Sequence, residues 1–135
     1  MGYEVFIYKF EKGDASGIPH KDVDDILSKY GKVVEGNFGL EFMSSVGDVC
    51  DYCSLSADDH GQITCIQFSR PTISEELPKI VFDLLSIQGT CFFGPDLEFM
   101  QSRYSLGDNL PDALQEHFPD GPQIITRAGE SWPLK

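Results

Sequence analysis

Three short segments with the composition of β-strands follow one another between residues 34 and 68, with only turn residues between them. They span 34–42, 49–55 and 63–68. Such close spacing favours an antiparallel meander. Along the first segment, apolar side chains alternate with polar ones, which indicates a sheet with one face open to water. This meander constrains the fold more than any other feature of the chain.

Two segments with helical periodicity flank the meander. In the first, apolar residues recur at i, i+3, i+4 and i+7 over 23–30, and we expect Gly31 to cap that helix. The second has a strong apolar stripe over 77–85. A shorter helix is expected over 110–118. Further strands are expected before, between and after these helices.

The remaining strands are expected at 3–10, 91–93 and 123–127, and the first suits a central place in the sheet because its apolar residues fall on both faces. The order is therefore β-α-β-β-β-α-β-α-β. This pattern predicts an α+β fold, with a mostly antiparallel sheet of about five to six strands and helices packed on one face. A length of 135 residues fits a single domain over 1–135.

The meander carries a formal charge of −6, which is half of the net charge of this acidic chain. The formal net charge is −12, and residues 33–69 contain six carboxylates but no lysine or arginine. We expect this stretch to form an acidic patch on the sheet that attracts a basic protein and repels nucleic acid and anionic membrane. The candidate partner-binding residues are Glu35, Glu41, Asp48, Asp51, Tyr52, Asp58 and Asp59.

The composition narrows the class of protein further. No apolar run approaches the roughly 20 residues that a membrane-spanning helix needs, and the first residues do not resemble a signal peptide. We therefore expect a cytoplasmic protein. The sequence also contains no P-loop, dinucleotide fingerprint or nucleophile elbow, so no enzymatic activity and no cofactor is predicted.

The four cysteines allow a metal-binding alternative. Cys50 and Cys53 form a C-x-x-C pair, and Cys65 and Cys91 could complete a zinc site. Against this, residues three apart on a strand point to opposite faces. Buried, reduced thiols are the simpler interpretation in a cytosolic chain, and no metal site is predicted. A structural subunit that self-associates through a sheet edge is the other alternative.

Three segments carry a resemblance to a known family. The opening strand over 2–10, the turn Gly13-Asp14-Ala15-Ser16-Gly17-Ile18-Pro19 and the segment over 123–130 resemble immunity proteins of bacterial polymorphic-toxin and contact-dependent inhibition systems. The resemblance implies a protein that binds and neutralises a cognate toxin domain. The motif is structural, so it implies no site residue. A nuclease toxin would itself be basic, because it binds phosphate.

Overall fold

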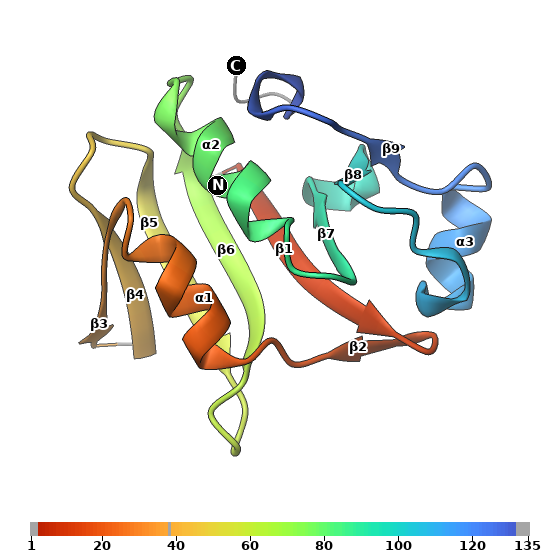
Figure 1. Ribbon diagram of the computed structural model, residues 1–135, viewed down its shortest axis with the longest axis horizontal. Coiled ribbons are helices and arrows are strands. Elements are labelled where there is room, and N and C mark those ends of the chain that lie inside the picture. Colours follow the sequence, from red (N-terminus) through yellow and green to blue (C-terminus); the bar gives the residue numbers. More distant parts are fainter. Residues whose placement is uncertain (1–2, 38, 132–135) are drawn as a thin grey trace.

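A nine-stranded, mostly antiparallel open sheet organises the chain (Figure 1). The computed structural model describes residues 3–37 and 39–131. The strands are β1 (Glu4–Glu11), β2 (Asp14–Ser16), β3 (Gly31–Gly36), β4 (Gly39–Ser44), β5 (Cys50–Ala57), β6 (Ile63–Pro71), β7 (Thr90–Phe93), β8 (Met100–Ser102) and β9 (Gln123–Ile124). They lie in the order β3-β4-β5-β6-β1-β7-β8-β9, and β2 pairs with β1.

The helices are short. The α-helices are α1 (His20–Leu27), α2 (Glu76–Leu84) and α3 (Asp112–His117), and single turns of 3-10 helix cover Pro95–Leu97, Gly107–Asn109 and Ala128–Glu130. Pro78 is the third residue of α2, within the first turn, where its missing N–H is not needed. Within the described ranges, the helices lack both the length and the apolar character needed to cross a bilayer.

The α+β class and the mostly antiparallel sheet are confirmed, but the expected five to six strands are too few. The segment 34–42, predicted as one strand, is a hairpin in which Val34 pairs with Glu41. Gly39 has a φ of 113°, a backbone conformation that favours glycine, and the chain reverses its direction there. Phe38, which the alternation pattern had used, lies outside the described residues. A reversal inside an alternating segment leaves the polarity pattern nearly intact, so the sequence did not reveal it.

Two other differences concern short elements. The expected turn over 13–17 is a two-residue turn at Lys12 and Gly13, both with positive φ, followed by β2. The predicted strand over 123–127 is limited to β9, which runs parallel to β8. Strands β8 and β9 are joined by only two residue pairs, so the sequence shows almost no alternation of polar and apolar residues there. Each element is too short to show a periodicity.

Gly31 does not cap α1. The helix ends at Leu27 with Ser28 as its C-cap, and Gly31 opens β3. A Cβ at Gly31 would lie 2.1 Å from the Met43 carbonyl oxygen. The glycine is therefore required by the close approach of β3 and β4, not by a left-handed helix end.

The main core lies between one face of the sheet and the helices α1 and α2, which Figure 1 shows in front of the strands. Val23 and Leu27 of α1 and the apolar stripe of α2 are buried against that face. Burial of these side chains supplies the main driving force for folding, at about 25 cal/mol per Å² of apolar surface. The sheet residues of this core include Val5, Ile7, Phe42, Cys53, Leu55, Ile66, Phe68 and Phe92.

A second, smaller core lies on the opposite face. Phe10, Cys91 and Met100 are buried there, and Leu114 and Phe118 from the α3 region pack against them. Directly paired residues share a face of the sheet, and successive residues of a strand point to opposite faces. Tyr8 and Cys91 are paired and lie on the face of this second core, whereas the next pair, Ile7 and Phe92, lies on the face of the main core. The expectation that all helices pack on one face is therefore wrong for α3.

Candidate partner-binding surface

Strands β4 and β5 separate before they meet their connecting loop. Their ladder contains only two pairs, Leu40 with Leu55 and Glu41 with Ser54. Strand β4 nevertheless continues to Ser44, and β5 begins at Cys50. The space between the diverging strands is a groove of about 240 Å³. The groove thus lies inside the acidic meander, beside the residues that the sequence singled out.

Four of the seven predicted residues line this groove: Glu41, Asp48, Asp51 and Tyr52. Asp48 and Asp51 are exposed, whereas Glu41 and Tyr52 are half-buried. Partial desolvation raises the pKa of the Tyr52 phenol, and the negative charge of Glu41 adds to this effect. The lining residues include no lysine or arginine. The groove is therefore an acidic hollow with one aromatic wall.

Gly36 determines where the Glu41 carboxylate lies. A Cβ at Gly36 would lie 1.2 Å from Glu41 Oε2, which is far too short a separation for two non-bonded atoms. The Glu41 side chain therefore crosses from β4 over the bare backbone of β3. The sequence contained a signal for this contact, because a glycine inside a strand often marks a place where another group comes close to the backbone.

Two contacts from Thr72 hold the loop that carries Asp48 and leads into β5. The Thr72 hydroxyl donates to the Asp48 carbonyl oxygen at 2.7 Å, and the Thr72 N–H donates to the Val49 carbonyl oxygen at 2.9 Å. Asp51 forms an ion pair with Arg70, with 3.3 Å between the Asp51 oxygen and Arg70 Nη1. Both side chains of this pair are about 60% exposed, so water and salt weaken it and Asp51 remains accessible.

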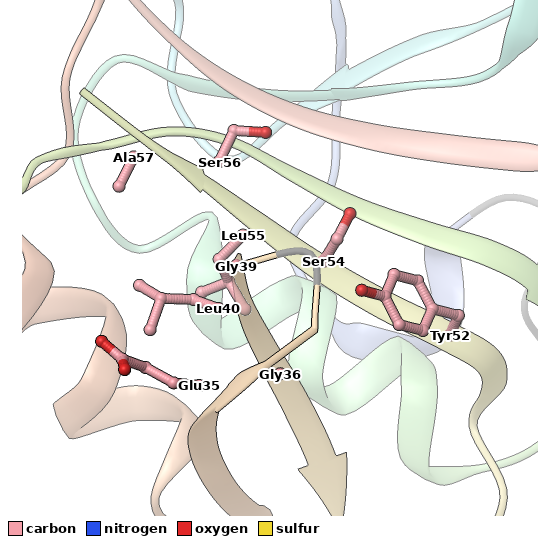
Figure 2. A pocket seen from close by; sticks show the side chains of 9 residues that line it. All are labelled: Glu35, Gly36, Gly39, Leu40, Tyr52, Ser54, Leu55, Ser56 and Ala57. Carbon is pink, nitrogen blue, oxygen red and sulfur yellow. The ribbon is translucent and has the colours of Figure 1, made fainter.

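Glu35 is set apart from the groove. It pairs with Leu40, which pairs with Leu55, so it belongs to the face that α1 and α2 cover, although it is exposed at the sheet edge. Figure 2 shows a second, larger pocket of about 630 Å³ around the tip of the β3–β4 hairpin, with Glu35 and Tyr52 at its opposite sides. Tyr52 therefore borders both hollows.

Asp58 and Asp59 lie at the other end of β5, in the turn to β6. Five residues along β5 separate Asp58 from Cys53, the last groove residue on that strand, which is roughly 16 Å at about 3.3 Å per residue. Asp58 Oδ1 accepts hydrogen bonds from the His60 N–H at 2.9 Å and the Gln62 N–H at 3.0 Å. Asp58 thus shapes the turn. The expectation of one continuous patch that includes all six carboxylates is wrong.

The cysteines are all free thiols, and Cys53, Cys65 and Cys91 are buried. Burial, the largest cause, raises the pKa of each of the four, to about 11 for Cys50, where the charge of Asp51 adds to it. Thiols of this kind are poor nucleophiles at neutral pH. Among residues 3–37 and 39–131, no three His, Cys, Asp or Glu side chains form a group that could hold a metal ion.

The arrangement can attract and hold a cation-bearing surface. Three acidic residues line one hollow, only one of them has a described basic partner, and Tyr52 lines the hollow with them. Four of the residues predicted from the sequence line this groove, but the sequence did not indicate the divergence of β4 from β5 that forms it. Comparison of the chain with protein-family models, curated proteins and solved structures found no match.

Proposed function

We propose that the protein is an immunity protein, which binds a basic toxin domain through the acidic groove between β4 and β5 and neutralises it. The observation that carries the proposal is that Glu41, Asp48 and Asp51 line one groove together with Tyr52. The resemblance of the sequence to immunity proteins of polymorphic-toxin systems supplies the biological context. The partner class follows from charge: a nuclease domain must be basic to bind phosphate.

Electrostatic steering explains what the charge contributes. A net charge of −12 creates a negative field around the whole molecule, and the groove concentrates that field at one place. Fields of this kind raise association rate constants by about 10- to 1000-fold at low salt. Fast association is useful to an inhibitor that must capture its toxin before the toxin reaches nucleic acid.

Tyr52 is the proposed anchor of the complex. Tyrosine is enriched among the residues that dominate binding energy, especially where surrounding groups exclude water. Tyr52 is half-buried and borders both hollows of the surface. In this proposal the carboxylates control the rate of encounter, whereas Tyr52 controls the lifetime of the complex.

The test uses the toxin domain encoded immediately beside this chain, purified as a catalytically inactive variant. We expect a 1:1 complex by titration calorimetry and protection of cells that express the active toxin domain. A Tyr52→Ala variant should dissociate at least tenfold faster, while its association rate constant stays within twofold. No heat of binding at micromolar concentrations would refute the proposed function.

A further inference from the structure

A continuous row of paired residues crosses the face of the sheet that α1 and α2 leave uncovered. Its members occupy β4, β5, β6, β1 and β7 in turn and are joined by consecutive strand pairings: Glu41, Ser54, Gln67, Phe6 and Phe93. A second row on the same face joins Tyr52, Ser69 and Glu4. Directly paired residues lie side by side on one face, so these two rows form one surface.

Helices cover this face only at one end. The buried residues of α1 and α2 belong to the core on the opposite side of the sheet. The α3 region packs over Phe10, Cys91 and Met100, and it reaches Phe93 only at its border. The other members of the long row, from Glu41 to Phe6, are half-buried with no described helix over them.

The two ends of the row differ in chemistry. At the β1–β7 end the rings of Phe6, Tyr8 and Phe93 form a cluster, in which Tyr8 stacks on Phe93 with 5.4 Å between centroids. At the β4 end lie Glu41 and the acidic groove. Small hydrogen-bonding side chains fill the middle, where Gln67 Nε2 donates to Ser69 Oγ at 3.2 Å. Aromatic residues are enriched at protein interfaces, and polar and charged residues surround them.

Charge decides which occupant fits the surface. A second copy of the chain would bring another −12, so the two molecules would repel each other as they approach. Like charges placed together across an interface cost several kcal/mol. A basic protein meets no such cost, and its lysines and arginines can face Glu4, Glu41 and the groove.

We infer that the uncovered face of the sheet, from Glu41 to Phe93, is the docking surface of the same basic toxin domain. The inference rests on the proposed function and extends it from the groove to five strands. The partner contributes a flat, partly apolar patch that covers the aromatic cluster, and basic residues that reach the acidic end.

Substitution at the centre of the face tests this inference without changing the charge. Gln67→Trp adds bulk where the partner would lie, and tryptophan is well tolerated in strands. Gln88→Trp is the matched control, because Gln88 is exposed in the turn between α2 and β7. Circular dichroism and the thermal midpoint establish that both variants fold. Binding kinetics are then measured with the inactive toxin domain encoded beside this chain.

We expect Gln67→Trp to raise the dissociation rate constant at least 30-fold, with an association rate constant within a few-fold, while Gln88→Trp behaves as wild type. Wild-type kinetics for a folded Gln67→Trp variant would overturn the inference and leave the proposed function standing. Failure of the wild-type chain to bind would refute both. Sedimentation equilibrium tests the alternative occupant, a second copy of the chain. If the wild-type chain is a dimer and Gln67→Trp is a monomer, the face binds a second copy instead.

Discussion

The two ends of β5 use acidic residues in opposite ways. At its start, Asp48 and Asp51 line a groove together with Glu41, and only Asp51 has a described basic partner. At its end, Asp58 accepts two backbone hydrogen bonds and shapes the turn into β6. Both ends are equally acidic in sequence, with two aspartates each. The comparison teaches that charge density alone does not separate a binding carboxylate from a turn-forming one.

Neutralising the groove should have the largest effect on binding. The triple variant Glu41→Gln/Asp48→Asn/Asp51→Asn should lower the association rate constant for the basic toxin domain by about 10- to 100-fold at low salt. The difference should shrink at physiological salt, where the screening length is about 8 Å. Stopped-flow fluorescence across a salt series measures both effects.

A matched triple variant distinguishes local from global charge. Asp108→Asn/Glu116→Gln/Asp120→Asn removes three exposed carboxylates in and around α3, so both triple variants change the net charge from −12 to −9, by three units. The α3 variant should slow association only a few-fold. Equal slowing by the two variants would show that the groove has no special part in steering.

The turn end of β5 should respond in stability instead. Asp58→Ala removes the acceptor of two backbone N–H groups, so we expect the free energy of unfolding to fall by about 1–2 kcal/mol. Urea denaturation measures this change. Asp59→Ala is the control, and surface substitutions of its kind usually stay within about 0.5 kcal/mol. Association with the toxin domain should be within twofold of wild type for both; a tenfold loss for Asp58→Ala would extend the binding surface to this end.

The sequence predicted those features of β5 and its turn that depend on local chemistry. The turn over Asp58 to Gly61 followed from residue types that favour turns, and the strands around it from their β-branched and aromatic residues. The divergence of β4 from β5 could not be predicted, because it depends on which pairs of a long hairpin remain hydrogen-bonded. The uncovered face depends on the placement of α3, which tertiary packing decides. The main core followed the periodicity of the sequence, whereas the proposed binding surface did not.

The position of one carboxylate can be changed without changing the charge. In Gly36→Ala the new Cβ would occupy the place of Glu41 Oε2, so the carboxylate must move away from β3. We expect the toxin complex to dissociate up to about fivefold faster, which corresponds to the loss of one exposed ionic contact of under 1 kcal/mol. Association should be unchanged, because the carboxylate keeps its charge and moves by less than the screening length of about 8 Å. Surface plasmon resonance measures both rate constants. A slower association would contradict the expectation that only dissociation changes.

The smallest effect is expected where a basic residue opposes the groove. Arg70→Gln removes the ion-pair partner of Asp51, so the local potential becomes more negative and association with a basic partner should speed up by about twofold at low salt. The stability should change little, because an exposed pair contributes about 0–1 kcal/mol. Lys21→Gln is the control: it breaks the exposed pair with Asp25 on α1, far from the groove along the chain, with the same change in net charge. If Lys21→Gln speeds association as much as Arg70→Gln, the field of the whole molecule dominates. If only Arg70→Gln does, the start of β5 is where the partner first arrives.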